Sequence, residues 1–162
     1  MTQPIYVCGP TASGKSSLAI ELARIMNGEI VNADAYQLYE GLEIISAAPD
    51  TSELAQVPHH LYGVLRPNEL CDAMRYREMA LDVISSIKSR GKVPIITGGS
   101  GLYLKFLSHG PSAVPSGDTV LREKLEKQTD ESLVARIQEL DPEGASITNL
   151  KNRRYVIRAL EI

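Results

Sequence analysis

One segment near the start of the chain limits its possible folds and ligands more than any other. Residues 9–16 have the sequence GPTASGKS and match the phosphate-binding loop pattern G-x-x-x-x-G-K-[ST] at every required position. A short apolar run, 5–8, precedes the loop, and a helical pattern begins within it. Backbone N–H groups of such a loop surround a phosphate, the lysine adds a cation, and the final hydroxyl joins a Mg²⁺ shell. The sequence therefore predicts a di- or triphosphate site, with Ser16 as the metal ligand, formed by Gly9, Pro10, Thr11, Ala12, Ser13, Gly14, Lys15 and Ser16.

The apolar pattern of the first two thirds of the chain predicts an α/β fold with a parallel sheet. Helical patterns at 15–26 and 72–89 alternate with short apolar runs, and a further helix begins at Leu102. The region 36–67 is irregular and interrupted by prolines, although 61–65 has the composition of a short strand. We expect a phosphate-loop core over residues 1–110, with helices flanking strands at 5–8, 29–33 and 93–97.

The composition changes at 109–119, where glycine, proline and serine are concentrated. This change predicts a hinge, followed by the start of a helical insertion domain; the two together cover 111–150 and include one polar helical segment at 120–140. Residues 151–162 have the pattern of a return helix toward the core. Its apolar stripe has nothing after it to pack against, and only three clearly apolar strand segments precede it. We therefore expect the chain to be C-terminally incomplete.

Charge and cysteine content exclude several classes of protein. Seventeen Lys and Arg against 20 Asp and Glu give a net charge of −3, which excludes a strongly basic nucleic-acid coat but not a local basic patch. No apolar run is long enough to span a membrane. Two cysteines cannot form a disulfide framework, and Cys8 lies in a predicted buried strand. We expect a cytoplasmic protein without a membrane partner.

Two further segments follow predicted strands at the edge where open α/β sheets bind ligands. Asp34 comes directly after the second strand, where a carboxylate can accept a proton, hold a metal or simply cap a local turn. The segment 98–101, GGSG, follows the third strand. It can form an oxyanion contact or serve as a strand-to-helix turn with Ser100 as the helix N-cap. Position alone leaves both alternatives open in each case.

Histidine and arginine residues provide two weaker signals. His59 and His60 are adjacent, but neighbouring side chains of an extended segment point in opposite directions, so structural roles are expected. Arg154 and Arg158 are four residues apart on one helix face and belong to a small basic cluster with Lys151 and Arg153. That cluster suits phosphodiester contacts, and equally a solvated charged face.

Taken together, these segments resemble the tRNA dimethylallyltransferases, also called tRNA isopentenyltransferases. The resemblance covers nearly the whole chain in the family's order and spacing. It is carried by GPTASGKS at 9–16, NADAYQLYEGLEI at 32–44, PHHLYGVL at 58–65, GGSGLYLK at 98–105 and RALE at 158–161.

The resemblance implies transfer of a dimethylallyl group from its diphosphate to the exocyclic amine of the adenosine 3′ of a tRNA anticodon. The loop would then bind the diphosphate of the donor together with Mg²⁺. Asp34 matches the family's general base, and Ser100 stands where the family usually has Thr and would contact the leaving diphosphate. The adenosine must leave its stack to reach the donor. The tRNA contacts implied by the resemblance are Asp34, Ala35, Tyr36, Gln37, Ser100, Arg122, Arg154, Tyr155, Val156, Ile157 and Arg158.

Some positions depart from the family pattern. Asn152 and Tyr155 replace residues that are commonly Asp and Arg, and ISAAP at 45–49 replaces the more usual GTAKP. Family members also continue well beyond the RALE helix, and the resemblance implies a monomer for a complete chain. Two alternatives remain at this point: a small-molecule or nucleoside kinase that uses the loop for ATP, and an inactive remnant that binds diphosphate or tRNA.

Overall fold

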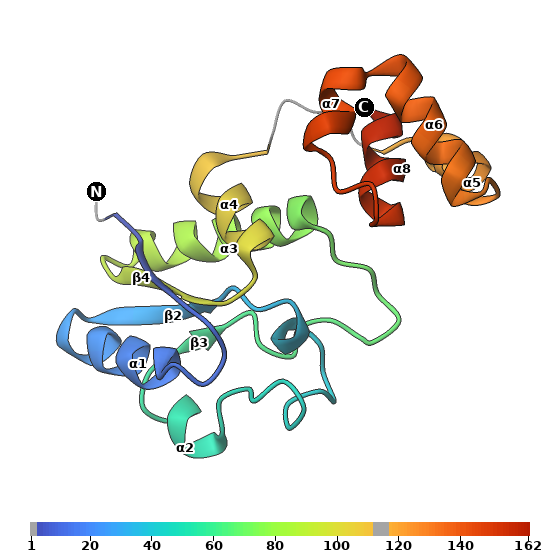
Figure 1. Cartoon of the computed structure of the whole chain (residues 1–162). Helices are drawn as coiled ribbons and strands as arrows, with labels where there is room; N and C mark the ends of the chain where they lie inside the picture. Colours follow the sequence, from blue (N-terminus) through green and yellow to red (C-terminus); the bar gives the residue numbers. More distant parts are fainter. Residues whose placement is uncertain (1–2, 112–116) are drawn as a thin grey trace. The chain divides into compact units, whose positions relative to one another are not determined.

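The computed structural model describes residues 3–111 and 117–162, so the centre of the predicted hinge, 112–116, lies outside the described residues. The chain divides into two compact units, 1–112 and 113–162, each of which is described by itself (Figure 1). The elements of the first unit are β1 (Ile5–Cys8), α1 (Lys15–Ile25), β2 (Gly28–Asn32), the 3₁₀ helix η1 (Tyr36–Leu38), α2 (Thr51–Leu54), β3 (His59–His60), α3 (Ala73–Ser89), β4 (Val93–Gly98) and α4 (Gly101–His109).

The four strands form one parallel sheet in the order β1-β4-β2-β3. This result confirms the parallel α/β fold predicted from the alternation of apolar runs and helical patterns. The strand expected at 61–65 instead occupies His59–His60. Leu61 has a φ of 63°, in the left-handed region, which ends the extended conformation directly after His60. Beyond it, Leu65 makes only an isolated bridge with Tyr39.

Helices cover both faces of the sheet (Figure 1). Successive side chains of a strand point to opposite faces. Ile30 and Ile95 therefore pack with α1 on one side, whereas Val31 and Ile96 pack with α3 and α4 on the other. Every residue of β2 and β4 is buried, because these two strands are the central ones. Full burial of each such aliphatic side chain stabilises the fold by about 1.5–3 kcal/mol.

The first strand is less buried than its composition predicts. β1 pairs with β4 alone, and only Val7 of its four residues is buried. The expectation that Cys8 is a core residue is therefore wrong: its side chain lies on the opposite face from Val7 and is exposed.

A buried carboxylate joins the central strands to the helical layer at the start of β2. Glu29 is 3% exposed; its Oε2 lies 2.6 Å from His60 Nε2 and 2.7 Å from Arg90 Nη2, and its Oε1 lies 2.8 Å from Lys92 Nζ. Burial alone would raise the pKa of Glu29, but hydrogen bonds from these three side chains lower it to about 2. His59 instead contacts the Val57 carbonyl, at 2.8 Å. The two histidines thus have separate structural partners, as expected.

The second unit is helical. Its elements are α5 (Thr119–Glu126), α6 (Asp130–Leu140), α7 (Pro142–Ile147) and α8 (Arg153–Glu161). The predicted single segment at 120–140 is two helices, because Thr129 Oγ1 accepts a hydrogen bond from Ser132 N and begins α6 as its N-cap. In the described ranges, no helix has both the length and the apolar composition needed to cross a membrane.

The apolar side of α8, which has nothing after it in this chain to pack against, packs instead against the helices that precede it. Val156 and Ile157 are buried against residues of the other helices in this unit. α5 and α6 supply most of this cover, so α8 completes a small core within residues 117–162. The other buried members of that core are Leu125, Leu133, Ile137 and Ala145.

Candidate active site

The phosphate-loop motif forms the turn between β1 and α1. Gly14, the N-cap residue of α1, has a φ of 82°, and Ala12 has a φ of 61°. No side chain caps α1, so the N–H groups of its first turn remain available to an anion. Lys15 Nζ donates to the Pro10 carbonyl, at 2.6 Å, and thereby ties its ammonium to the loop. The loop therefore presents uncapped backbone N–H groups and the Lys15 ammonium at the start of α1.

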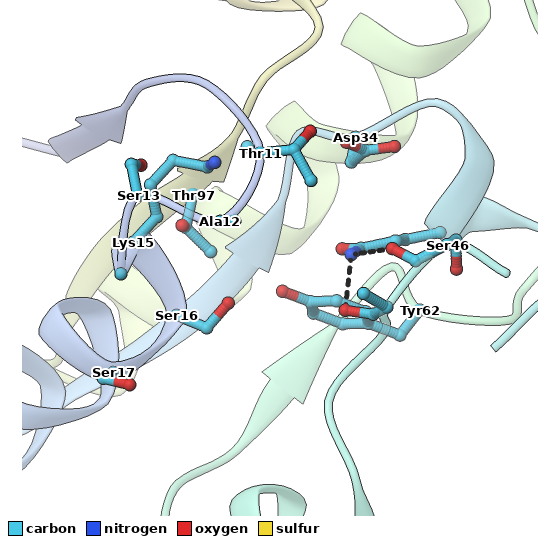
Figure 2. Close-up of a pocket in the computed structure, with 14 residues that line it drawn as sticks. Thr11, Ala12, Ser13, Lys15, Ser16, Ser17, Asp34, Ser46, Tyr62 and Thr97 are labelled. Carbon is cyan, nitrogen blue, oxygen red and sulfur yellow. Dashed lines mark hydrogen bonds between the residues drawn. The ribbon is translucent and has the colours of Figure 1, made fainter. Parts of the chain in front are cut away.

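A cavity of about 260 Å³ lies beside this loop, at the carboxyl ends of the parallel strands. Figure 2 shows the side chains of Lys15, Ser16, Asp34 and Tyr62 around this space. Four of the segments that line the cavity are the motif, the segment after β2, the segment after β3 and the end of β4. Its lining residues are Thr11, Ala12, Ser13, Gly14, Lys15, Ser16, Ser17, Asp34, Gln37, Ser46, Ala47, Tyr62, Thr97 and Gly98.

A glycine at the end of β4 permits the close approach of two strand ends at this cavity. A Cβ atom on Gly98 would lie 2.3 Å from the Ala33 carbonyl, closer than any side chain can approach. Ala33 N in turn donates to the Thr97 carbonyl, at 2.7 Å. The backbone of β4 therefore lies directly against the segment that carries Asp34.

Asp34 is held in place by the buried residue Asn32. Asn32 Oδ1 accepts from Asp34 N at 2.8 Å, and Asn32 Nδ2 donates to the carbonyls of Asp34 (3.0 Å) and Leu61 (2.9 Å). The hydroxyl of Tyr76 donates to the Asn32 carbonyl, at 2.9 Å. Asp34 Oδ1 accepts from Tyr36 N at 3.0 Å, so the carboxylate caps a turn and lines the cavity at the same time. The two alternatives for Asp34 are thus compatible with each other.

The segment after Asp34 lies between Ser100 and the loop at 46–47. Ser100 is the N-cap residue of α4, but its hydroxyl accepts a hydrogen bond from Ala35 N, at 2.9 Å, instead of capping the helix. It stands behind Asp34 and is not part of the cavity lining. Gln37 Nε2 donates to the Ser46 carbonyl at 2.9 Å and to the Ala47 carbonyl at 3.1 Å. The Gln37 amide nitrogen therefore holds the loop at 46–47. The Tyr36 side chain, in contrast, is exposed.

Sequence analysis missed two hydroxyl groups at this cavity. Burial, with a smaller contribution from the nearby Asp34 carboxylate, raises the pKa of the Tyr62 phenol, which therefore stays protonated. Thr97 is 4% exposed, and its Oγ1 is buried without a hydrogen-bond partner among the described residues. A polar residue at the end of the apolar run 93–97 is the signal that could have identified Thr97. Asn32, a polar residue at the end of β2 after Ile30 and Val31, carries the same signal.

The predicted tRNA contacts of the second unit separate into exposed and buried residues. Arg154 and Tyr155 are exposed, whereas Val156 and Ile157 are 1% and 5% exposed and contribute to the core. The exposed side chains of the predicted stretch 154–158 are thus polar, while the tRNA contact of the whole stretch stays a prediction. Arg122 and Arg158 both bind the carboxylate of Glu161.

Arg153, a neighbour of this stretch, has a structural role. Its guanidinium pairs with Asp130 and donates to the carbonyls of Glu126 (2.9 Å) and Gln128 (2.7 Å). It therefore joins the end of α5 to the start of α6, a role that neither alternative for the basic cluster had predicted.

Comparison with known proteins identifies the family. The model of the family described as IPP transferase matches residues 37–162. The chain belongs to this family. Its relatives include the tRNA dimethylallyltransferase of Akkermansia muciniphila, which is 47% identical over 158 residues and is matched over 98% of this chain and 54% of its own length. That of Anaeromyxobacter sp. (strain Fw109-5) is 43% identical, with coverage of 100% and 55%.

Solved structures of IPP transferases share the fold. The full-length tRNA isopentenylpyrophosphate transferase of Bacillus halodurans superposes with a TM-score of 0.67 at 32% identity, over 99% of this chain and 55% of that one. A eukaryotic dimethylallyltransferase acting on tRNA gives a TM-score of 0.84 at 29% identity, over 100% of this chain and 41% of that one. The chain thus spans about half the length of the curated relatives it matches.

Proposed function

We propose that this chain carries the prenyl-donor and adenosine sites of a tRNA dimethylallyltransferase. The observation that carries the proposal is the single cavity lined by Lys15, Ser16 and Asp34, which places a diphosphate-binding loop beside a carboxylate. The relatives that bear this name, at 43–47% identity, support the same reaction. Membership of the IPP transferase family favours prenyl transfer over phosphate transfer by a kinase.

The proposed reaction is a substitution at an allylic carbon. The exocyclic nitrogen of adenosine forms a bond to the first carbon of the dimethylallyl group, and the bond from that carbon to the diphosphate oxygen breaks. The diphosphate leaves with the electron pair, and the Asp34 carboxylate receives the proton that the nitrogen loses. Lys15 and the N–H groups at the start of α1 stabilise the charge that develops on the leaving diphosphate.

The donor set at the cavity fits Mg²⁺. Mg²⁺ keeps several waters and binds through one or two protein oxygens together with substrate phosphates. Ser16 and Asp34 supply a hydroxyl and a carboxylate at one cavity, and the buried Thr97 Oγ1 beside them lacks a partner among the described residues. When bound, the ion would neutralise diphosphate charge. We assign Ser16 to its shell, with Asp34 left to act as the base.

The tRNA side of the proposal uses both units. Asp34, Ala35, Tyr36 and Gln37 would hold the target adenosine, and the Gln37 carbonyl oxygen is the amide atom left for the base once its nitrogen holds the loop. Ser100, through its bond to Ala35 N, would fix this segment from outside the cavity lining, and its O–H remains available as a donor. In the second unit, Arg122, Arg154, Tyr155 and Arg158 would contact the RNA backbone.

Label transfer tests the proposal directly. The 162-residue chain, Mg²⁺ and labelled dimethylallyl diphosphate are incubated with an unmodified anticodon stem-loop that has adenosine 3′ of the anticodon. The control is the same stem-loop with uridine at that position. We expect label on the first RNA alone. Equal labelling of both RNAs, or no labelling of either, would contradict the proposal. Transfer from labelled ATP in place of the prenyl donor would favour a kinase.

A further inference from the structure

The tyrosine that follows β3 is a polar residue of the cavity to which the proposed function gives no role. Tyr62 lines the cavity together with Lys15 and Ser16 of the phosphate loop. Figure 2 shows the hydroxyl end of its ring directed toward the side of the cavity on which Ser16 lies. The phenol therefore points toward the end of the cavity where the first turn of α1 begins.

The main chain is fixed on both sides of Tyr62. Leu61 and Gly63 have φ angles of 63° and 57°, so the chain turns before and after the tyrosine. The Leu61 carbonyl accepts from Asn32 Nδ2 at 2.9 Å, and Gly63 N donates to the Gln37 carbonyl at 2.9 Å. These two bonds join the neighbours of Tyr62 to the end of β2 and to the segment that follows it. The tyrosine therefore keeps a fixed place relative to that segment.

The ring of Tyr62 is packed, whereas its hydroxyl is unpaired. The ring lies edge-on to His59, with centroids 5.5 Å apart, and packs against the apolar cluster formed by α1 and the sheet. Among the described residues, the Tyr62 hydroxyl has no hydrogen-bond partner. Burial raises the pKa of the phenol, so the group keeps its proton. A held and protonated O–H is thus available to donate to a ligand in the cavity.

A phosphate group is the occupant that suits this donor. Lys15 and the uncapped N–H groups at the start of α1 make this part of the cavity favourable for an anion. A hydrogen bond from an O–H to a charged phosphate oxygen is about twice as strong as one between neutral groups. The Asp34 carboxylate also lines the cavity, but its Oδ1 accepts from Tyr36 N, and no hydrogen bond joins it to Tyr62.

We propose that Tyr62 is a further diphosphate-binding residue, whose O–H donates to a phosphate oxygen of the ligand held by the loop 9–16. The inference rests on the diphosphate site of the proposed function and needs no RNA. The ligand is then bound from two elements: the loop supplies N–H donors and a cation, and the segment after β3 supplies the phenol. In the proposed substitution, the same O–H stabilises charge that develops on the leaving diphosphate.

Tyr62→Phe tests the O–H alone, because the ring and its packing are kept. The experiment titrates the full chain with inorganic diphosphate in the presence of Mg²⁺ and measures the Kd by calorimetry. We expect the Kd to rise about tenfold, which corresponds to the loss of one hydrogen bond to a charged group.

The matched control is Tyr6→Phe on β1. It removes the same O–H from a tyrosine that points to the face of the sheet opposite to Val7, and Val7 packs with α1. This variant should leave the Kd for inorganic diphosphate within about twofold of the wild type, since no ligand contact is lost.

Thermal unfolding separates a binding role from a structural one. Without ligand, Tyr62→Phe should unfold at the wild-type temperature or slightly above it, because the O–H has no protein partner to lose. At one fixed concentration of inorganic diphosphate, the ligand should raise the Tm less in the variant than in the wild type.

Unchanged affinity of Tyr62→Phe for inorganic diphosphate overturns the inference. It does so even if label transfer falls, because that combination would mean that Tyr62 acts on Asp34 instead. A Tyr62→Phe chain that unfolds at a lower temperature without ligand, or fails to fold, assigns the O–H a structural role and also overturns it. A wild-type chain that binds no diphosphate overturns both this inference and the proposed function. A wild-type chain that binds diphosphate but transfers no label contradicts the proposed function alone.

Discussion

The two units hold their candidate residues by different means. At the cavity of the first unit, the main chain sets most positions: the positive φ angles of Ala12 and Gly14 shape the loop, and the parallel register brings the strand ends together. The Asn32 side chain then fixes Asp34 through neighbouring main-chain groups. In the second unit, Arg122 and Glu161 are 39 residues apart and meet only through their side chains. In the first unit, replacing a functional side chain should therefore remove its chemical role without displacing the residues around it. In the second unit, replacing a side chain should displace the residues that it contacts.

The largest effect should come from the candidate base. Asp34→Asn keeps an oxygen that can accept from Tyr36 N, so the turn should be preserved. Loss of a general base typically slows a reaction about 100- to 10,000-fold. We expect transfer to fall by that factor while the affinity for dimethylallyl diphosphate stays within about twofold, since the loop is unchanged. Single-turnover transfer and equilibrium dialysis measure the two quantities.

The control for that prediction is Asp50→Asn, which changes an exposed capping carboxylate on α2. It should leave transfer unchanged. Retained transfer in Asp34→Asn would remove the base assignment, and loss of donor affinity together with transfer would show that the side chain also shapes the loop.

The next largest effect concerns stability. Glu29→Gln removes the carboxylate that Arg90, Lys92 and His60 share, and breaking a buried ion pair costs about 3–5 kcal/mol. The folded pKa is about 2, below the ordinary value of 4.5. The stabilisation from Glu29 is therefore complete above pH 4.5 and is lost as the pH falls toward about 2. Urea unfolding at neutral and acid pH should show a large difference between wild type and variant only at neutral pH.

An exposed pair provides the comparison for Glu29. Glu21→Gln breaks a contact with Arg24 in which both side chains are more than half exposed, so it should change stability by no more than about 1 kcal/mol. A pH profile of Glu29→Gln parallel to that of the wild type would show that Glu29 is not the group responsible for the acid dependence.

Donor binding should depend on the lysine of the loop. Lys15→Ala removes an ammonium at the cavity, and a charged hydrogen bond contributes about 1.5–3 kcal/mol. We expect the Kd for dimethylallyl diphosphate to rise about 10- to 100-fold. Transfer at low donor concentration should fall in parallel. Lys124→Ala, an exposed lysine of α5, should leave donor affinity unchanged. Unaltered affinity in Lys15→Ala would place the diphosphate elsewhere.

Sequence reasoning predicted best what depends on contiguous residues. The loop 9–16 is a continuous motif between β1 and α1, and the central strands β2 and β4 are rich in contiguous apolar residues, so the place of the loop and these strands follow from local pattern. β3 has only two residues and ends where Leu61 turns left-handed, which apolar periodicity does not reveal. The break between α5 and α6 depends on one hydrogen bond at Thr129, within a segment whose pattern is helical throughout.

Residues that act through distant partners were the ones sequence reasoning missed. Asn32 contacts Leu61 across 29 positions, and Tyr76 contacts Asn32 across 44. Sequence reasoning used Glu161 only as the last residue of the RALE motif. Its ion pair was not predicted, because its partner Arg122 lies on another helix. Tertiary folding creates such contacts, so a single sequence contains no local pattern for them.

The smallest expected effect is a loss of stability in the second unit, at Thr129, where a continuous helical pattern is divided into α5 and α6. Thr129→Ala removes the N-cap contact to Ser132 N, which is long at 3.3 Å, so the loss should lie toward the low end of about 0.5–2 kcal/mol. Thr129→Ser keeps a capping hydroxyl and should match the wild type in thermal unfolding. Donor affinity should not change in either variant, because the loop 9–16 belongs to the other unit. A change in donor affinity on loss of this cap would show that the two units are energetically coupled. The donor site could then no longer be treated as independent of side-chain contacts in the second unit.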